Sequence, residues 1–548
     1  MSRSPLFRNL TRAMRIALYC EKHNISTSQG LEQLAALESR VAGWRANRRE
    51  FLALSAVSAF GAVAGHMNRS YAVPPSNSNV KVGIVGAGLA GLACGYELKK
   101  SGISATLYEA SNRAGGRCFS LGGSFGGSVN FPNQVVERGG EFIDNLHKTM
   151  IGYARQFGLT LEDMGKQPGE IFYYFNGQRY PESVVVNEYR NFVAAMRKDL
   201  LKLSAAPTAD KHTDADVLLD NTNLLEYLET RQAGSVIKAA IAAAYQTEFG
   251  RELHEQSCLN FLLFIHADKR SKFTPFGVFS DERYHIVGGN EQVVQGLRNN
   301  LQGQIKLGMR LIKVRKDAMN RIQLTFQNGL QTTSATYDAV VLTIPFTALR
   351  DVELDPSLEL PAWKRQAIAQ LDYGTNAKMM VGFNGRPWLT DGSNGTSYSN
   401  LLNHQTTWES NPTKATNTSA VLTDYSSGNR GTNLNPNAVQ LEAKKFLTDL
   451  NIIYPGASGL AARDPKGNIK AHLEHWPSHP LVKGSYACYK PGQFTTIAGN
   501  EGKPIGNIHF AGEHTNSFYE WQGYMEGAAL SGIQAAKEIL QDLKVGTL

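Results

Sequence analysis

The 548-residue sequence predicts an α/β fold made of two interleaved domains. Three observations predict it: closely spaced glycines after a β-branched run near residue 82, a glycine pair at 139–140, and a strand, turn and helix pattern in 507–536. Domains usually hold about 100–200 residues, so this length allows two to four structural units. If the first and last segments share one domain, that domain is discontinuous.

The composition is that of a globular protein, with 42% hydrophobic and 19% charged residues. These values exclude a mainly disordered or fibrous chain. The 52 glycines occur in clusters without a fixed period, which excludes collagen and favours phosphate-binding loops. The five cysteines include no Cys-x-x-Cys pair, so we expect neither a metal site nor a disulfide scaffold.

The excess of basic residues lies mostly in one terminal segment. The net charge is +8 at pH 7, and residues 1–72 hold ten Lys and Arg against four Glu, whereas the rest of the chain holds 46 basic residues against 44 acidic ones. The main body of the protein is therefore nearly neutral, and no nucleic-acid partner is expected.

That basic segment contains an arginine pair, Arg48 and Arg49, followed by a weakly apolar run within 47–65. The pattern resembles a twin-arginine export signal, which implies export machinery as a partner and a soluble mature protein in the periplasm or cell exterior. The alternative is an anchoring or core helix, but the apolar run of about 14 residues is shorter than the roughly 20 that span a membrane. We expect residues 1–72 to be a presequence. The 46 residues before the motif look helical and basic, and no role is assigned to them.

The first glycine cluster follows a predicted strand, Val82 to Val85, and opens a predicted helix. Glycines at these spacings allow a tight turn, a close approach of the backbone to a pyrophosphate, and close packing of helix on strand. The N–H groups of the helix N-terminus attract phosphate. A second strand, Ala105 to Tyr108, ends at Glu109, about where an acid binds ribose hydroxyls. The alternative, a glycine-rich turn in an ordinary βαβ unit, does not explain this acid. The expected dinucleotide contacts are Gly86, Gly88, Leu89, Ala90, Gly91, Glu109 and Ala110.

The segments that follow distinguish FAD from NAD. Arg113-x-Gly115-Gly116-Arg117 comes directly after the acid, and a later strand ends in Glu137-Arg138-Gly139-Gly140-Glu141. Here the sequence resembles the flavin-containing amine oxidase superfamily, which includes monoamine and polyamine oxidases and L-amino-acid oxidases. The resemblance implies that Gly116 and Arg117 lie beside the FAD diphosphate and that Gly139, Gly140 and Glu141 approach the flavin ring. Arg117 could instead be a solvated loop cation.

The C-terminal segment carries the most specific motif. A short strand, Ile508 to Phe510, precedes Gly512 and Glu513, and a helix of small residues opens at Gly523-Tyr524-Met525. The resemblance implies that Glu513 binds the ribityl chain and that the helix N-terminus at Met525 faces the pyrimidine end of the flavin. We expect the chain to re-enter the same domain at residue 284, in a middle segment that includes a strand through Leu311. The resemblance covers nearly all of 80–540.

These segments define the expected architecture: a discontinuous Rossmann-like FAD-binding domain interleaved with a mixed α+β substrate-binding domain. We assign 78–150, 284–350 and 470–545 to the FAD-binding domain. The substrate-binding domain takes a helical stretch, 151–283, and a mixed stretch, 351–469, whose Asn-rich part at 391–437 is expected to be loops.

The resemblance implies hydride removal from a carbon that carries a neutral amine, for which the cofactor supplies the redox chemistry. No nucleophile or metal-spaced His cluster stands out in the sequence. The family places two aromatic side chains around the amine, and Tyr524 and Trp476 are the expected catalytic residues. Tyr486 and Tyr489 are further candidates, and core packing is the alternative for each of them.

We expect FAD to be bound non-covalently. Where the covalent branch of the family carries its flavin-linked cysteine, this chain has Gly484, and Cys488 comes four residues late. Cys488 is expected to be a buried apolar residue.

Two departures from the family pattern limit the substrate prediction. Arg350 and Asp351 stand where many members carry a flavin-adjacent lysine, and no arginine follows the second glycine turn to pair with a substrate carboxylate. A substrate carboxylate would need another partner, and Arg138 and Arg350 are two candidates. Four acids, Glu141, Glu248, Asp281 and Glu282, could attract a cationic substrate, although a solvated surface is the alternative. Asp268-Lys269-Arg270 is expected to be exposed.

The expected function is therefore FAD-dependent oxidative deamination of an L-amino acid, giving an imine, then an oxo acid, ammonia and hydrogen peroxide; the four acids favour a basic amino acid as the substrate. A mono- or polyamine oxidase that forms an aldehyde is the first alternative. A desaturase-type flavoenzyme and an inactive flavin-binding protein are the others. Oxygen or a quinone would accept the electrons, and a homo-oligomer is expected.

Overall fold

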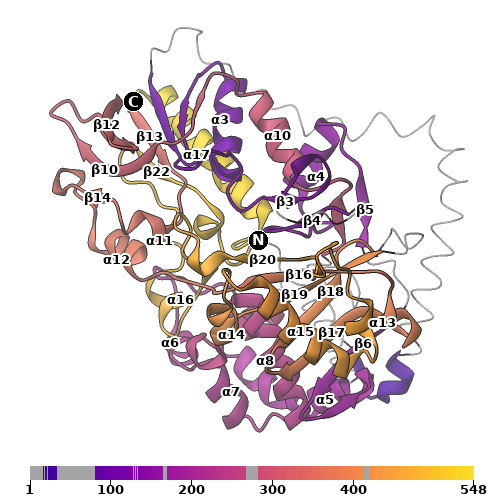
Figure 1. Cartoon of the computed structure of the whole chain (residues 1–548). Coiled ribbons are helices and arrows are strands. Elements are labelled where there is room, and N and C mark those ends of the chain that lie inside the picture. Colours follow the sequence, from indigo (N-terminus) through magenta and orange to yellow (C-terminus); the bar gives the residue numbers. More distant parts are fainter. Residues whose placement is uncertain are drawn as a thin grey trace, which may run out of the picture.

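Figure 1 shows the protein as a computed structural model. The structure describes short stretches between residues 16 and 33, and residues 80–548 apart from 128, 130, 132–133, 165–168, 267–281 and 413–418. The expected export signal, the run Asp268-Lys269-Arg270 and Asp281 lie outside the described residues. Within the described part of the chain, no helix has the length and apolar character needed to cross a membrane.

A five-stranded parallel sheet forms the framework of the predicted nucleotide-binding region. Its order is β22 (Ile508–Phe510), β13 (Ala339–Leu342), β1 (Val82–Val85), β2 (Thr106–Tyr108) and β9 (Ile305–Lys306). All four residues of β1 are buried, as expected for a strand in the middle of a parallel sheet that is covered on both faces. The predicted strands near 82, 105 and 508 are confirmed, and the sheet joins segments from the two ends of the described chain.

Two long helices, α3 (Leu89–Lys100) and α17 (Met525–Val545), pack against each other beside this sheet (Figure 1). Their contact depends on glycine: a Cβ atom on Gly532 would stand 2.0 Å from the carbonyl oxygen of Ala90. A Cβ on Gly91 would stand 2.0 Å from the carbonyl oxygen of Gly86, which confirms the close packing of helix on strand predicted for Gly91. Helices α4 (Lys148–Gln156) and α10 (Glu291–Asn299) also contact α3 or α17.

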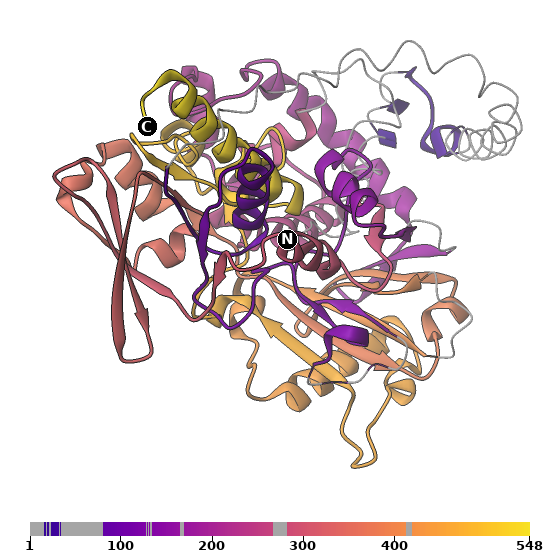
Figure 2. The ribbon, with the colours of Figure 1, turned by 90° about the horizontal axis from the view of Figure 1, so that it is seen from above.

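A four-stranded sheet extends from this region and lies at the left-hand edge of Figure 2. Its order is β12 (Gln331–Tyr337), β11 (Ile322–Asn328), β10 (Arg310–Lys316) and β14 (Glu353–Leu354). Two helices follow in the chain, α11 (Phe346–Leu349) and α12 (Ala362–Gln370).

A seven-stranded mixed sheet lies in the second part of the molecule. Its order is β20 (Ala471–His475), β16 (Ala377–Phe383), β19 (Ala420–Ser426), β18 (His404–Glu409), β17 (Ser393–Leu401), β6 (Glu170–Phe175) and β7 (Gln178–Tyr180). The segment 470–545, which we assigned to the FAD-binding domain, therefore begins with a strand of this second sheet, β20. Helices α13 (Pro387–Thr390), α14 (Gly428–Asn433) and α15 (Val439–Ile453) lie in the same region of the chain.

The prediction that 391–437 consists of loops is wrong, because this stretch contains β17, β18, β19 and α14. Many of the described polar side chains on its strands are buried and bond to one another across the strands. Ser397 Oγ lies 2.6 Å from the hydroxyl of Thr407, and both ring nitrogens of His404 bond to serine hydroxyls. Polar composition indicates a loop only when the polar groups need water, and here neighbouring strands satisfy them.

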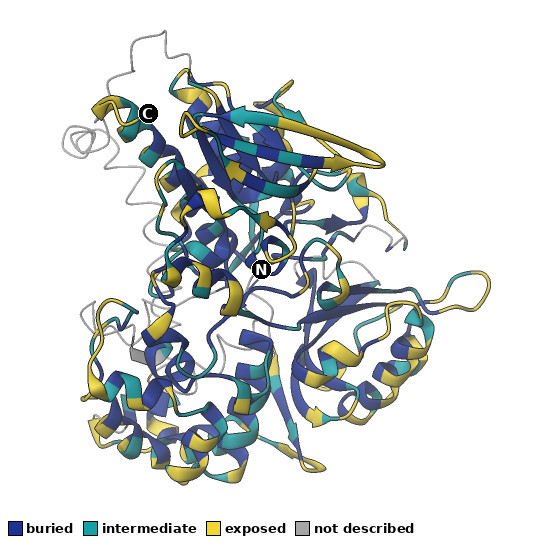
Figure 3. Cartoon of the chain, turned by 90° about the vertical axis from the view of Figure 1, so that its left-hand side faces the viewer, coloured by how far each residue is buried: buried dark blue, intermediate teal, exposed yellow. Residues whose placement is uncertain are grey.

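Within the stretch 151–283 that was predicted to be helical, helices dominate 182–266, whereas 161–180 contains the strands β5 (Leu161–Asp163), β6 and β7. They are α5 (Glu182–Leu200), α6 (Asp214–Asp220), α7 (Leu224–Thr230), α8 (Ser235–Phe249) and α9 (Leu259–His266). Three two-stranded sheets connect the parts: β3 (Ser120–Leu121) with β4 (Val136–Glu137), β5 (Leu161–Asp163) with β8 (Tyr284–Ile286), and β15 (Asp372–Tyr373) with β21 (Ala487–Cys488). The short α16 (Gln493–Thr496) follows β21. Buried residues, dark blue in Figure 3, fill the centre of both parts.

Candidate active site

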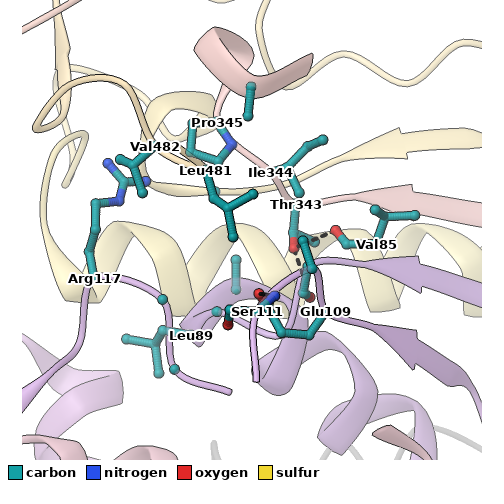
Figure 4. Close-up of a pocket in the computed structure, with 18 of the residues that line it drawn as sticks. Val85, Leu89, Glu109, Ser111, Arg117, Thr343, Ile344, Pro345, Leu481 and Val482 are labelled. Carbon is teal, nitrogen blue, oxygen red and sulfur yellow. Dashed lines mark hydrogen bonds between the residues drawn. The ribbon is translucent and has the colours of Figure 1, made fainter. Parts of the chain in front are cut away.

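A cavity of about 380 Å³ lies where the parallel sheet, α3 and α17 meet (Figure 4). Side chains and backbone from widely separated segments line it, including fourteen of the residues predicted from the sequence. They are Gly86, Gly88, Leu89, Ala90, Glu109, Ala110, Gly116, Arg117, Leu311, Trp476, Gly512, Glu513, Tyr524 and Met525. A cavity of this size lies within the range of small-molecule sites.

Two helix N-termini open into the cavity. Gly88 precedes α3 and Tyr524 precedes α17, and neither helix has a side-chain cap on its first turn. The first N–H groups of a helix have no partner within it, so both ends offer donors and a partial positive charge. A Cβ atom on Gly88 would meet no atom of the described residues within 4 Å, which leaves the approach to α3 open.

Glu109 organises the turn at the start of α3. Its carboxylate accepts hydrogen bonds from the backbone N–H groups of Ala87 and Ser111, both at 2.9 Å. On the other side of the turn, the hydroxyl of Thr343 donates to the carbonyl oxygens of Val85 (2.9 Å) and Gly86 (3.1 Å). The acid and the glycine turn are therefore held together at the end of β2, as the motif predicts (Figure 4).

Arg117 and Glu513 form an ion pair in the cavity wall, with 2.8 Å between Nη1 and Oε1. Arg117 also donates to the carbonyl oxygen of Ser485 (2.6 Å), and the other carboxylate oxygen of Glu513 accepts from the N–H of Ala487 (3.3 Å). Burial by itself would raise the pKa of Glu513, but Arg117 and then His514 hold that pKa below its usual value of 4.5. Arg117 is thus a wall residue and not a solvated loop cation.

Four predicted residues lie behind the cavity wall. Gly91 packs on Gly86, as described above. A Cβ on Gly139 would stand 1.7 Å from the carbonyl oxygen of Arg117, and one on Gly140 would stand 2.7 Å from Cγ of Met525. Glu141 is buried and paired with a lysine. The second glycine turn therefore supports two lining residues, Arg117 and Met525, through contacts that only glycine allows.

The two aromatic residues predicted to be catalytic both line the cavity and are both buried. The indole N–H of Trp476 donates to the carbonyl oxygen of Arg138 at 3.0 Å, which fixes its ring. The ring of Tyr524 makes edge contacts with His147 and Trp521, whose ring centres lie 5.2 and 5.6 Å away. These rings are therefore held in place by packing.

Tyr486, the first of the two further aromatic candidates, is held in place by hydrogen bonds. Its neighbours on both sides bond to the Arg117 and Glu513 pair, and its hydroxyl donates to the carbonyl oxygen of Glu248 at 2.6 Å. A Cβ on Gly523, the residue before Tyr524, would lie 3.7 Å from its ring. Tyr489 instead bonds to the carboxylate of Glu501 at 2.5 Å. Both tyrosines contact the segment before Tyr524, Tyr486 at Gly523 and Tyr489 through the side chain of Gln522 at 2.9 Å, and neither lines the cavity.

A functional candidate missed by the sequence reasoning is Lys378 of β16. Its ammonium lies 2.7 Å from Glu141 and donates to the carbonyl oxygen of Gly139 at 2.9 Å. The other oxygen of Glu141 accepts from the indole of Trp408 at 2.9 Å. The signal was a single cation inside an otherwise apolar strand, AKMMVGF, because a lysine buried there needs a charged partner.

Three of the acids predicted to attract a cation, Glu141, Glu248 and Glu282, are at most 1% exposed. The surface alternative for these acids is therefore excluded. Burial raises the pKa of Tyr425, and the three acids raise it further. The ammonium of Lys378 lies 5.7 Å from the ring centre of Tyr425, whose hydroxyl lies 3.2 Å from that of Tyr486.

The arginines considered as carboxylate partners are bonded elsewhere. Arg138 pairs with Glu474, and its guanidinium stacks on Phe119. Arg350 donates to the carbonyl oxygens of Ile368 and Leu371. Neither residue lines the cavity.

Cys488 is buried in β21, as predicted, and does not line the cavity. Cys118 does line it, but its thiol donates to the carbonyl oxygen of Asn290, and burial raises the pKa of the thiol. Neither sulfur is a reactive thiolate. Among the described residues, no cluster of His, Cys, Asp or Glu could hold a metal ion.

The sequence is similar to those of known flavoenzymes. A family described as flavin containing amine oxidoreductase matches residues 89–540. L-amino-acid oxidase of Naja atra is 26% identical over 489 residues, covering 84% of this chain and 88% of the relative. A putative L-amino-acid oxidase of Bacillus subtilis is 25% identical, covering 83% and 94%.

Solved structures share the fold. Cyclohexylamine oxidase from Brevibacterium oxydans aligns with a TM-score of 0.71 at 21% identity, covering 85% of this chain and 100% of that chain. Putrescine oxidase bound to putrescine aligns with a TM-score of 0.67 at 20% identity, covering 84% and 99%.

Proposed function

The chain belongs to the flavin-containing amine oxidoreductase family, and we propose that this enzyme oxidatively deaminates an L-amino acid, with basic amino acids as the favoured class. The imine product hydrolyses to an oxo acid and ammonia, and oxygen is reduced to hydrogen peroxide. One observation carries the proposal: two uncapped helix N-termini, Glu109 and the Arg117–Glu513 pair converge on one cavity that ends at Tyr524.

These residues fit FAD, the cofactor of the family, in a non-covalent site. The first turn of α3 and Arg117 would hold the diphosphate, Glu109 the ribose, and Glu513 the ribityl chain. The N-terminus of α17 would face the pyrimidine end of the flavin ring. When bound, FAD supplies the hydride acceptor.

The protein's own contribution is to orient the amine. Tyr524 and Trp476 line the cavity, and the ring of Tyr486 lies next to Gly523, the residue before Tyr524, with its hydroxyl held by the Glu248 carbonyl. We assign the amine to the space between these rings, where buried aromatic faces exclude water. No general base is needed for hydride removal from a neutral amine.

The preference for a basic substrate rests on three buried acids, Glu141, Glu248 and Glu282. Lys378 neutralises Glu141, whereas Glu248 and Glu282 add negative charge to the interior. The ring centre of Tyr425 lies 5.7 Å from the Lys378 ammonium, and its hydroxyl lies 3.2 Å from that of Tyr486. A side-chain ammonium or guanidinium would be attracted to this region. The names of the relatives support an amino acid, whereas the structural neighbours named for cyclohexylamine and putrescine support a simple amine as the second candidate.

Anaerobic mixing with a substrate panel tests the proposal, with loss of the flavin absorbance as the readout. We expect L-lysine or L-arginine to bleach the flavin faster than L-leucine, and faster than putrescine or cyclohexylamine. Bleaching by amines alone would reassign the enzyme to the amine oxidases. A flavin that no compound reduces would support an inactive flavin-binding protein, and absence of a flavin band would exclude both.

A matched variant separates amine oxidation from a desaturase-type reaction. Tyr524→Ala should lower the reduction rate of the flavin by about 10- to 100-fold, because orientation of the amine is lost. Tyr519→Ala, which removes a half-buried neighbouring ring that does not line the cavity, is the control. An unchanged rate in Tyr524→Ala would favour the desaturase reading. Twin-arginine export, oxygen rather than a quinone as acceptor, and a homo-oligomer belong to the same proposal.

A further inference from the structure

A helical segment precedes the arginine pair, and no sequence motif assigns it a role. Of the described residues at this end, 16–17, 19–20, 23, 27–31 and 33 are helical. The N–H of Ile25 donates to the carbonyl oxygen of Cys20 at 3.0 Å, and the thiol of Cys20 donates to the carbonyl oxygen of Ser26 at 3.5 Å. A Cβ on Gly30 would stand 2.2 Å from the sulfur of Cys20. The two helical pieces therefore pack face to face as a hairpin.

The hairpin contacts α5 through specific polar bonds. Arg190 of α5 donates to the hydroxyl of Thr27 at 2.9 Å and to the carbonyl oxygen of Ile25 at 2.8 Å. The same hydroxyl of Thr27 donates to the side chain of Asn187, one turn earlier on α5. Hydrogen bonds from a guanidinium are stronger than neutral ones and depend on geometry, so this contact specifies one docked position.

Apolar burial accompanies these bonds. Ile16, Ala17 and Cys20 are at most 4% exposed and belong to the same core cluster as Val185 and Tyr189 of α5. In Figure 1 this segment, coloured indigo, lies next to α5. The hairpin thus contributes buried side chains to the core of the helical part, as an integral element of a domain does.

We propose that the described residues between 16 and 33 form a helical hairpin that remains docked on α5 in the finished enzyme and is a structural part of its helical domain. Processing that removed 1–72 entirely would take away two hydrogen-bond acceptors of Arg190 and expose the apolar surface under Ile16 and Cys20. The hairpin is therefore retained, whatever the fate of 47–65.

Hydrogen–deuterium exchange of the flavin-loaded full chain, followed by mass spectrometry, tests this. Peptides within 16–33 should exchange slowly. Arg190→Ala should speed their exchange by roughly tenfold or more, because a charge-assisted bond is lost. Arg197→Ala is the matched control, since Arg197 lies exposed on the same helix. The flavin spectrum should not change in either variant.

Two results would overturn the proposal: complete exchange of 16–33 at the earliest time in the unmodified chain, or no change in that peptide in Arg190→Ala. If Arg190→Ala fails to fold, Thr27→Val removes the hydroxyl from the hairpin side at nearly constant volume. Faster exchange in 16–33 but not in α17 is then the supporting result, and unchanged exchange in 16–33 contradicts docking.

Discussion

The ammonium of Lys378 lies 2.7 Å from a carboxylate oxygen of Glu141, and both side chains are at most 3% exposed. Lys378 comes from the seven-stranded sheet, whereas Glu141 follows the glycine turn that packs on Met525. The pair therefore fixes the sheet that carries the proposed substrate region to the wall of the cofactor cavity.

Removing only one of the two charges should destabilise the protein strongly. Lys378→Met leaves a buried carboxylate without its cation, which typically costs about 3–5 kcal/mol. Lys378→Met combined with Glu141→Gln should cost less, because both charges are removed. Thermal unfolding of the flavin-loaded variants measures the difference, with exposed Lys444→Met as control. Equal losses in the single and double variants would contradict the ion pair.

Arg117 should be required for retention of FAD. Arg117→Ala removes the partner of buried Glu513 and one anchor of Ser485, so we expect a loss of about 3–5 kcal/mol and a lower flavin content. Arg117→Lys should restore part of it, since charge returns without the planar fork. The ratio of flavin to protein absorbance after gel filtration measures this. Exposed Arg463→Ala is the control, and a normal ratio in Arg117→Ala would refute the assignment.

A single added methyl group should have opposite effects at two helix glycines. Gly91→Ala places a carbon 2.0 Å from the backbone oxygen of Gly86, so the glycine turn must move and FAD affinity should fall. Gly152→Ala in α4 meets no described atom within 4 Å and should stabilise the protein by about 0.5–1 kcal/mol. Flavin titration and thermal unfolding test the two variants. Equal behaviour would contradict the packing described here.

Acid should destabilise the seven-stranded sheet through His404. Burial lowers the pKa of His404 to about 4, from an ordinary value of 6.5. The unfolded chain therefore binds a proton that the folded chain does not between these pH values, and stability falls as pH drops below 6.5. The loss is about 2 kcal/mol between pH 6.5 and 5, at about 1.4 kcal/mol per pH unit.

His404→Gln keeps polar atoms near Ser397 and Ser399 but cannot titrate in this range. Its unfolding temperature should therefore depend less on pH between 5 and 6.5 than that of the unmodified protein. Parallel pH curves for the two proteins would show that His404 does not cause the acid sensitivity.

Sequence patterns predicted the nucleotide-binding strands, both glycine turns and most of the cavity wall. These features are local: a run such as Val82 to Val85 or the spacing of Gly86, Gly88 and Gly91 fixes backbone geometry within a few residues. The strands in 391–437 were missed because their polar side chains are satisfied by partners on other strands, as Ser397 is by Thr407.

The sequence by itself thus determined the family, the cofactor and the residues of the first turn, because each depends on short motifs. Only the tertiary structure decided that Lys378 pairs with Glu141, 237 positions away, and that the ring of Tyr486 lies next to Gly523. The physical reason is that a buried charge or hydroxyl is stable only when a partner pairs with it. Which residue becomes that partner depends on how distant strands and helices pack.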